Sequence, residues 1–440
     1  MKEKIALINP PSPFLIDEKV FPNLGLLYLA TQMRSDGYNI KVFDFCGDKN
    51  YKENMKKISK DFDIYAFSST SPQFFYTYKL FNILKKNNKK AFCVIGGAHS
   101  SSIFSLKRKL NSKEDPNIRT LEEFDLILGG DGEVNYKEIF KQGSKWRESI
   151  LNDIDDAPIP AREFYNLNSY HYKLNGQRAT TIMTQRGCPF DCIFCCGRDV
   201  EFYRKLRQHS PEHVAEEMRY LESIGYKAFV WFDDEININP KRLEKIADLI
   251  KDKGYIHRGF LRSDLLIKHP ESLDALVDMG FVELCIGVES GSERIFELIN
   301  KHTTTEVNYK AVDMIKKKGI RLKTFTMIGF PSETYEDIMK TKEWLIKARP
   351  DDFDIAMLTP YPGSPIYDDA KQSTKFKDYR WEYKGLYFNK PDYSNQIAFQ
   401  KGILGQYSCY IRTDELSSEN FLKLRDDLEK EIKSKLKIEI

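Results

Sequence analysis

The sequence of 440 residues has no long apolar run, no strong excess of one charge and no low-complexity tract. No apolar stretch approaches the ~20 residues that a membrane-spanning helix needs. The apolar start of the chain stops after a few residues at Pro10 and Pro11, which indicates a buried strand rather than a signal peptide. We therefore expect a cytoplasmic protein, in which thiols stay reduced. The net charge of only +3, with both signs interleaved, argues against nucleic acid as a partner.

Cysteine is also scarce, with 8 residues in the whole chain, yet four of them fall within nine positions of the stretch RGCPFDCIFCCG (186–197). The other four are scattered, and the first three of these lie in or beside apolar segments: Cys46, Cys93, Cys285 and Cys409. We interpret the scattered cysteines as ordinary interior thiols. The clustered cysteines are the strongest chemical signal in the sequence.

The first 140 residues alternate short apolar runs with helical patterns. Strands are predicted over 5–10, 40–45, 63–70, 91–97 and 124–130. Near-continuous apolar strands with helical crossovers are typical of a parallel sheet that is covered on both faces. The sequence therefore predicts a Rossmann-like, doubly wound α/β domain over 1–140. Glycine- and serine-bearing tips follow three of these strands and favour a binding crevice there, at 68–73, 96–101 and 129–133.

Residues 141–178 are predicted to be a linker, because Pro158 and Pro160 disfavour regular structure. A second alternation runs over 179–370, with predicted strands at 179–184, 228–234, 259–264, 282–290, 322–330 and 353–361. A full eight-unit barrel takes about 250 residues, so this length predicts a partial (β/α)6 TIM-like barrel that is open on one side. Beyond it we expect a mostly helical extension over 371–440, with one charged amphipathic helix at 417–435.

Zinc is one candidate for the clustered cysteines, because disulfides are improbable in a reducing compartment. The zinc-finger spacing, C-x-x-C followed by H-x-x-x-H, is met by Cys192, Cys195, His209 and His213. Against zinc, a helix is predicted to begin at Pro211, so His209 lies outside it. The pattern also leaves two of the four clustered cysteines without a role.

An iron–sulfur cluster is the other candidate. Three thiolates in a loop that leaves a barrel strand suit a [4Fe–4S] cluster with one iron free for a substrate or cofactor, and they are Cys188, Cys192 and Cys195. Cys196 directly follows Cys195 and would normally point another way. We interpret Cys196 as a bystander thiol, with a fourth ligand as the alternative.

The segment CPFDCIFC resembles the CxxxCxΦC signature of radical S-adenosylmethionine (SAM) enzymes, with Phe194 in the aromatic position. The resemblance continues in the same order through WFDDE (231–235), LRSD (261–264), GVESGSE (287–293), INKHTT (299–304), IGFPSET (328–334) and TPYPGSPIYD (359–368). It implies a [4Fe–4S] cluster on Cys188, Cys192 and Cys195, whose free iron is chelated by SAM. It also implies that one electron, from an external donor such as flavodoxin or ferredoxin, cleaves SAM to a 5′-deoxyadenosyl radical that activates the substrate.

The resemblance implies a SAM site at the carboxyl ends of the barrel strands, where a barrel has its active site. The expected SAM-binding residues are Phe194, Asp233, Asp234, Arg262, Ser263, Glu289, Ile328 and Gly329. The two aspartates and the neighbouring Glu235 would accept hydrogen bonds from the SAM ammonium, with helix capping as the alternative for Asp234 and Glu235. The arginine or serine would meet the carboxylate or ribose, and Glu289 the ribose or amino-acid part. The last two residues suit the adenine, which Phe194 shields.

The front domain resembles the cobalamin-binding domain of cobalamin-dependent radical SAM enzymes, through NPP, LGLLYLA and the tips IGGAH and GGDGE. The resemblance implies that the nucleotide tail of cobalamin lies along Ser68, Ser69, Thr70, Gly96, Gly97, Gly129 and Gly130. His99 would hydrogen-bond that tail, or else be an exposed loop histidine. The loop after the first strand has no histidine where DxHxxG proteins carry one, so we expect no histidine ligand to cobalt.

The resemblance implies a methyltransferase that uses one SAM to methylate cobalamin and a second to make the radical. The methyl group would pass from methylcobalamin to carbon or phosphorus of a small-molecule or peptide substrate. The alternative keeps both cofactors and catalyses a cyclisation or rearrangement without net methylation. A third hypothesis, from another class, is a zinc-stapled binding protein with a Rossmann-like front, which requires His209 and His213 as ligands.

Overall fold

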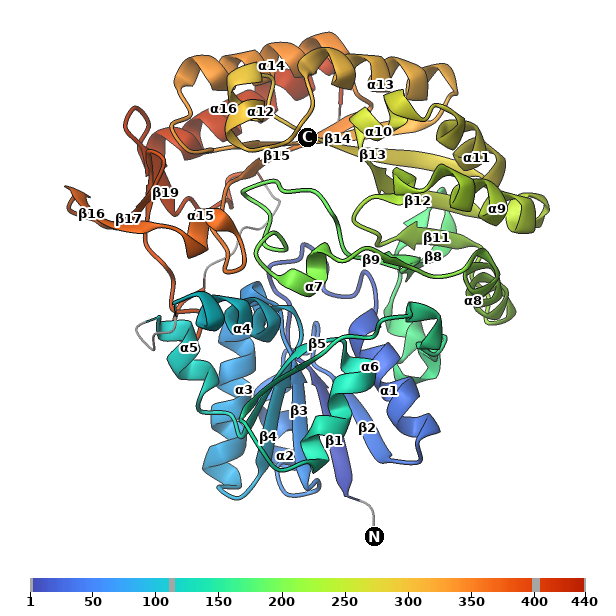
Figure 1. Ribbon diagram of the computed structural model, residues 1–440, viewed down its shortest axis with the longest axis vertical. Coiled ribbons are helices and arrows are strands. Elements are labelled where there is room, and N and C mark those ends of the chain that lie inside the picture. The colour runs from blue at the N-terminus through green and yellow to red at the C-terminus, as the bar shows by residue number, and fades with distance from the viewer. Residues whose placement is uncertain (1–2, 111–114, 398–403, 439–440) are drawn as a thin grey trace.

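The computed structural model describes residues 3–110, 115–397 and 404–438. Figure 1 shows an N-terminal α/β domain and a larger curved domain stacked along the long axis. The segment around β9 (Gln185–Arg186) and α7 (Glu201–Arg204) lies between them. The predicted fold class, a Rossmann-like sheet followed by a partial barrel and a C-terminal helix, is confirmed.

The N-terminal domain is built on a six-stranded, fully parallel sheet in the order β2-β1-β3-β4-β5-β6. Its strands are β1 (Lys4–Asn9), β2 (Asn39–Asp44), β3 (Ile64–Ser68), β4 (Phe92–Gly96), β5 (Leu126–Gly130) and β6 (Trp146–Ser149). Its helices are α1 (Leu24–Ser35), α2 (Tyr51–Ile58), α3 (Phe74–Asn87), α4 (Ala98–Leu110), α5 (Pro116–Leu121) and α6 (Gly132–Asn135). The sheet extends past residue 140, because the half-buried β6, which carries no apolar signal, pairs with β5.

Both faces of this sheet are buried, which explains the near-continuous apolar strands. Ala6 and Ile8 of β1 join the core that contains α3 and α4, whereas Ile5 and Leu7 join the core that contains α1. Parallel sheets of this kind bind ligands at the carboxyl ends of their strands. Those ends face the second domain (Figure 1).

A buried arginine of the linker, Arg162, ties it to the second domain. Its guanidinium donates to the carbonyl oxygen of Thr181 in β8 (Gln177–Ile182) at 2.8 Å, and to Glu217 Oε1 in α8 (Pro211–Ser223) at 3.0 Å. Both charged side chains are almost fully buried. Removing one partner of such a pair costs about 3–5 kcal/mol, so the linker has a defined position.

The second domain is a curved sheet of six parallel strands in the order β15-β14-β13-β12-β11-β8, with β7 (Lys173–Leu174) antiparallel at its edge. After β8 its strands are β11 (Ala228–Trp231), β12 (Ile256–Leu261), β13 (Phe281–Glu289), β14 (Arg321–Ile328) and β15 (Asp352–Met357). After α8 its helices are α9 (Pro240–Ile250), α10 (Ser263–Lys268), α11 (Glu271–Met279), α12 (Glu293–Leu298), α13 (Thr305–Lys317) and α14 (Tyr335–Ala348). All six predicted barrel strands are confirmed.

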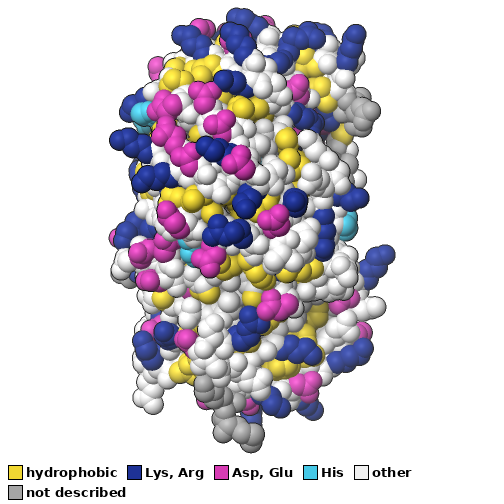
Figure 2. All heavy atoms as spheres, turned by 90° about the vertical axis from the view of Figure 1, so that its right-hand side faces the viewer, with side chains coloured by type: hydrophobic (Ala, Val, Ile, Leu, Met, Phe, Trp, Pro, Cys, Tyr) yellow, Lys and Arg dark blue, Asp and Glu magenta, His cyan; other side chains and the backbone are white. Residues whose placement is uncertain are grey.

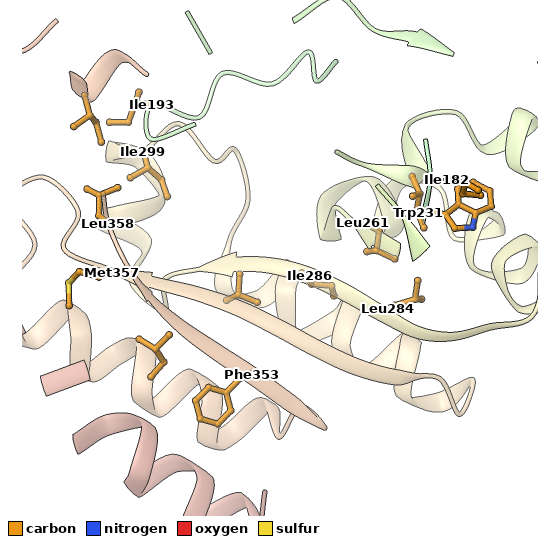
Figure 3. Packing of buried hydrophobic residues seen from close by; sticks show 14 of the residues in the cluster. Ile182, Ile193, Trp231, Leu261, Leu284, Ile286, Ile299, Phe353, Met357 and Leu358 are labelled. Carbon is orange, nitrogen blue, oxygen red and sulfur yellow. The ribbon is translucent and has the colours of Figure 1, made fainter. Parts of the chain in front are cut away.

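The curved sheet has a continuous apolar core. Figure 3 shows side chains from neighbouring strands in this core, among them Ile182, Leu261, Leu284 and Ile286, and all four are buried. Strands β12, β14 and β15 alternate fully buried with more accessible residues. This period of two is typical of a sheet with one face against helices and the other on an open concave side.

The C-terminal part adds a four-stranded antiparallel sheet that the sequence analysis did not predict. Its strands are β16 (Lys371–Phe376), β17 (Tyr379–Tyr383), β18 (Leu386–Phe388) and β19 (Ile411–Thr413), and they follow the short α15 (Pro365–Asp368). Lys384 and Gly385 both have positive φ and make a two-residue turn between β17 and β18. That turn is usually signalled by Asn-Gly or Asp-Gly, so the pattern was missed. The predicted helix is α16 (Ser418–Leu436), which packs on α14 and β15.

Figure 2 shows one face of the molecule, on which basic and acidic side chains are interleaved over both domains. Among the described residues, no helix is long and apolar enough to cross a bilayer.

Candidate active site

A cavity of about 560 Å³ lies between the two domains. The N-terminal domain contributes the end of β5, the start of α6 and part of α1, and the second domain contributes the cysteine loop and strand ends. Its lining brings together Tyr28, Gly130 and Asp131 with Cys188, Cys192 and Cys195. The three cysteines predicted to be ligands therefore open into one space that also reaches the front domain.

Backbone contacts hold the cysteine loop in place. Ile193 donates its N–H to the carbonyl oxygen of Ile299 at 3.1 Å, and Figure 3 shows its side chain near Ile299 and Leu358. Cys188 donates its N–H to the carbonyl oxygen of Tyr203 at 2.8 Å. Gly187 has φ +90°, and a Cβ there would lie 2.4 Å from the carbonyl oxygen of Lys205, so this position requires glycine. The sulfur atoms are thus presented by a fixed loop.

The chemistry of these thiols fits a metal cluster. Burial raises the pKa of Cys188 to about 12 and also raises that of Cys192. Thiolates form at such sites only when a cation stabilises them, and the thiolate is the metal-binding form. Three cysteines around one cavity therefore suit a [4Fe–4S] cluster with an iron that faces the open space.

The sequence analysis expected Cys196 to point away from the other cysteines, and this expectation is wrong. It lines the same cavity, and its thiol interacts with that of Cys195. The reason is that the chain turns at 195–198, where Arg198 donates its N–H to the carbonyl oxygen of Cys195 at 3.1 Å.

The histidines of the zinc-finger spacing belong to a different place. His209 Nδ1 lies 2.9 Å from Asp155 Oδ1, and His213 Nδ1 lies 3.8 Å from the same atom. The two rings are stacked, with centroids 4.0 Å apart and planes 14° from parallel. One ligand atom from each of the three residues lies within 4.8 Å of the others, so an ion bound by these histidines would lie beside Asp155. The structure thus groups the histidines with Asp155 and not with Cys192 and Cys195.

Asp233 is a correction to the predicted SAM site. Its buried carboxylate accepts hydrogen bonds from the backbone N–H of Thr184 at 2.6 Å and of Gln185 at 3.1 Å. Burial raises the pKa of Asp233 to about 6, although these hydrogen bonds act to lower it. Asp233 therefore fixes the chain between β8 and the cysteine loop and does not face the cavity.

Asp234 and Glu235 do line the cavity. The short turn that follows, at Ile236–Ile238, receives no capping hydrogen bond from the Glu235 side chain, so the capping interpretation of Glu235 is wrong. Burial raises the pKa of Glu235 to about 8 and raises that of Asp234. Asp234 is exposed and Glu235 is half-buried, so both carboxyl groups can contact a cationic ligand in the cavity, such as an ammonium or sulfonium group.

Glu289 lies at the end of β13 with φ +63°, and its Oε1 is 3.0 Å from Lys301 Nζ. Arg262 donates to both carboxylate oxygens of Asp264, at 2.8 and 3.2 Å, and its guanidinium lies 3.6 Å from the centroid of the Phe190 ring. All but Asp264 line the cavity. Sequence reasoning missed Lys301 and Phe190 as site residues, although both lie within the motif segments INKHTT and CPFDCIFC.

Three other predicted SAM residues lie outside the cavity lining. Ser263 is buried at the first residue of α10. Ile328 is part of the barrel core, and a Cβ on Gly329 would lie 2.2 Å from Ile411 Cδ1 in β19. The C-terminal sheet, which the sequence analysis did not predict, therefore occupies the space beside Gly329. Phe194 does line the cavity, with its ring edge-on to that of Phe330.

The tips of the front sheet are partly open. Ser68, Thr70, Gly96, Gly97 and Gly130 are half-buried, whereas Ser69, Gly129 and His99 are buried. A Cβ on Gly96 would meet its nearest atom only at 4.0 Å, so the backbone there is accessible to a ligand. Of these residues, Gly130 lines the cavity, and their contact with the tail of cobalamin stays a prediction.

His99 is not an exposed loop histidine. It stacks on Phe74 and bonds through Nδ1 to Ser71 Oγ at 3.0 Å, while its Nε2 has no partner among the described residues. Burial lowers the pKa of His99 to about 3, so the ring is neutral. The hydroxyl of Ser69 is also occupied, by Thr77 at 2.8 Å.

The sequence is similar to known radical SAM proteins. Residues 182–345 match the family model of the radical SAM superfamily. The chain is 29% identical over 405 residues to an uncharacterized methyltransferase of Pyrococcus horikoshii, which covers 86% of this chain and 85% of that protein. It is 24% identical over 424 residues to the anaerobic magnesium-protoporphyrin IX monomethyl ester cyclase of Rubrivivax gelatinosus (89% and 74% covered). It is 24% identical over 397 residues to the hopanoid C-3 methylase of Methylococcus capsulatus (84% and 73%).

Solved structures share the fold. The methyltransferase TsrM from Kitasatospora setae, with cobalamin and a [4Fe–4S] cluster bound, matches with a TM-score of 0.66 at 14% identity, over 98% of this chain and 89% of that one. The cobalamin-dependent radical SAM enzyme OxsB matches with a TM-score of 0.64 at 17% identity, over 84% of this chain and 55% of OxsB, so this chain spans about half of it. Residues 182–345 therefore form a radical SAM domain. The chain as a whole shares the fold of these cobalamin-dependent enzymes.

Proposed function

We propose that the protein is a cobalamin-dependent radical SAM methyltransferase, which methylates carbon or phosphorus in a small-molecule or peptide substrate. The observation that carries the proposal is the single cavity shared by three cysteines of the barrel loop and by the glycine tip of the front domain. Two relatives that match over most of their length are named a methyltransferase and a methylase. When bound, the [4Fe–4S] cluster, SAM and cobalamin supply the radical and the methyl group.

Different residues of the cavity wall contact different parts of SAM. Asp234 and Glu235 accept hydrogen bonds from its ammonium, because both line the cavity beside the cluster loop. Glu289 contacts the ribose or amino-acid part and is held by Lys301. Arg262, kept in place by Asp264, presents its positive charge toward the SAM carboxylate.

Aromatic side chains keep water away from the reacting groups. Phe190 and Phe194 come from the cysteine loop itself, and Phe232 projects from the end of β11. Phe330 supports Phe194 from behind, with ring centroids 5.6 Å apart. Exclusion of water protects a reactive radical from side reactions and strengthens the electrostatic contacts around it. The proposal includes a cytoplasmic location and an external one-electron donor such as flavodoxin or ferredoxin.

The proposal is tested by product analysis with anaerobically reconstituted protein, SAM, a chemical reductant and added cobalamin. A methyltransferase forms S-adenosylhomocysteine as well as 5′-deoxyadenosine. Formation of 5′-deoxyadenosine alone, from protein with full cobalamin, contradicts methyl transfer.

A cyclase or other rearrangement enzyme is the second candidate. The similarity to the anaerobic cyclase of Rubrivivax gelatinosus, which covers 89% of this chain, favours it. This candidate predicts 5′-deoxyadenosine without stoichiometric S-adenosylhomocysteine, so the same assay separates the two.

A further inference from the structure

Two arginines face each other at the base of the cysteine loop. β9 (Gln185–Arg186) pairs antiparallel with β10 (Arg207–Gln208), and Arg186 stands opposite Arg207. This pair of short strands closes the segment 187–206, which carries all four clustered cysteines. The side chains of Arg186 and Arg207 are only 12% and 4% exposed. Like charges directly opposite each other destabilise a strand pair, and burial removes the water that would screen them.

The front domain supplies the compensating charge. Asp131 accepts from Arg186 Nη1 through Oδ1 at 2.9 Å and from Arg207 Nη1 through Oδ2. Glu133 accepts from Arg186 Nη2. Both carboxylates come from the tip GGDGE and are less than a tenth exposed. Two buried arginines and two buried carboxylates make a neutral cluster, which is the condition for charges to remain in such a place.

Contacts within the front domain fix the position of the Asp131 carboxylate. Its Oδ2 also accepts the N–H of Leu151 at 2.8 Å. Gly130 has φ +94°, and a Cβ there would lie 2.1 Å from the carbonyl oxygen of Ser149, so the tip has one available backbone path. Tyr28 on α1 supports Arg186 from the same domain, with the guanidinium 4.9 Å from its ring centroid. The front domain thus holds the carboxylate rigidly where the two arginines meet.

We propose that Asp131, together with Glu133, is a positioning residue for the cluster-binding loop. By neutralising Arg186 and Arg207, the front domain closes the base of a loop that belongs to the other domain. Retention of the iron–sulfur cluster therefore depends on a carboxylate that touches no cysteine. The inference rests on the proposed function only in assigning the cluster to that loop; closure of the loop is a property of the protein without metal.

The test uses the full-length protein and three variants, Asp131→Asn, Arg207→Met and the double variant. Asp131→Asn keeps the shape of the side chain and removes its charge. We expect amide hydrogen exchange over 187–206 in the metal-free protein to speed up by about tenfold or more, since two buried like charges are left with one carboxylate. Iron and sulfide retained after anaerobic reconstitution and gel filtration should fall in parallel.

The double variant tests whether the effect of Asp131→Asn comes from the unbalanced charge of the arginines. Arg207→Met in the Asp131→Asn background removes one of the opposed charges and leaves Arg186 paired with Glu133. Exchange and iron retention should therefore return toward the wild-type values. Glu163→Gln is the matched control, because it removes the carboxylate of an exposed pair with Arg34 and neither residue lines the cavity, so it should change neither readout.

Two results would overturn the inference: wild-type exchange in Asp131→Asn, or a double variant as impaired as the two single variants added together. A wild-type protein that binds no iron would instead contradict the proposed function. Hydrogen exchange in the metal-free protein tests the closure of the loop in either case.

Discussion

Lys301 and Glu289 form an ion pair in the wall of the cavity, with Nζ 3.0 Å from Oε1. Both side chains are about nine-tenths buried, and Lys301 also lies close to Cys192 and Arg262. The pair connects the end of β13 with the segment that follows α12, on the side of the cavity that carries the cysteine loop.

Removing the carboxylate of this pair leaves a buried lysine unpaired. For Glu289→Ala we expect SAM to bind about tenfold or more weakly, which corresponds to ~1.4 kcal/mol. Thermal stability should fall as well, because an uncompensated buried charge is costly. The change of the cluster's electron paramagnetic resonance spectrum on titration with SAM measures the affinity. An unchanged midpoint would show that Glu289 does not contact SAM.

Replacement of single cysteines separates ligands from their neighbour. Cys188→Ser, Cys192→Ser and Cys195→Ser should each abolish the cluster, since serine is a poor ligand for iron–sulfur centres. Cys196→Ser should retain nearly full iron, although Cys196 lines the same cavity. Iron and acid-labile sulfide per chain are measured in parallel. Equal losses in all four variants would make Cys196 a ligand.

Substitution of the neighbouring Asp233 and Asp234 should have different effects, on stability in the first case and on SAM binding in the second. Asp233→Ala leaves the N–H groups of Thr184 and Gln185 without their acceptor, and we expect a loss of stability of about 1–3 kcal/mol. Asp234→Asn should leave stability nearly unchanged and weaken SAM binding, since its side chain faces the cavity. Urea unfolding and SAM titration of both variants check the contrast. A reversed pattern would contradict the assignment.

Glu235 makes stability depend on pH. Burial raises the pKa of Glu235 in the folded protein to about 8, above its ordinary value of 4.5. Between these values the folded state binds more protons than the unfolded state, so its contribution to stability falls as the pH rises. Metal-free wild type should lose more stability between pH 5.5 and 8 than Glu235→Gln, by a few kcal/mol. Parallel curves for the two proteins in urea would contradict the raised pKa.

The zinc hypothesis has its own test. His209 and His213 lie against Asp155 and not against the cysteines. Replacing both histidines with alanine should therefore leave iron content unchanged after anaerobic reconstitution. Loss of bound metal from that double variant would support the zinc-stapled protein instead.

Much of the fold and the centre of the site could be predicted from the sequence, because these signals are local. Apolar runs and their spacing located five strands of the front sheet and the six parallel strands of the curved sheet. The spacing of Cys188, Cys192 and Cys195 located the loop that opens into the cavity. The C-terminal sheet was missed because the Lys384–Gly385 turn has no strong sequence signature.

Other errors arose because tertiary contacts decide which way a polar side chain points. Asp233 and Asp234 are adjacent residues of the same type. Asp233 nevertheless accepts a hydrogen bond from the backbone N–H of Thr184, whereas Asp234 faces the cavity. The contact between Asp131 and Arg186 spans 55 positions of sequence and two domains. No periodicity within either segment reports such a contact.

The most direct test of the account is the amount of cobalamin per chain, after anaerobic expression with added cobalamin and gel filtration to remove free cofactor. The account predicts close to one cobalamin per chain in protein that also carries its iron–sulfur cluster. Cobalamin near zero, in protein with an intact cluster, would contradict it, since the open glycine tips would then serve some other purpose than holding this cofactor.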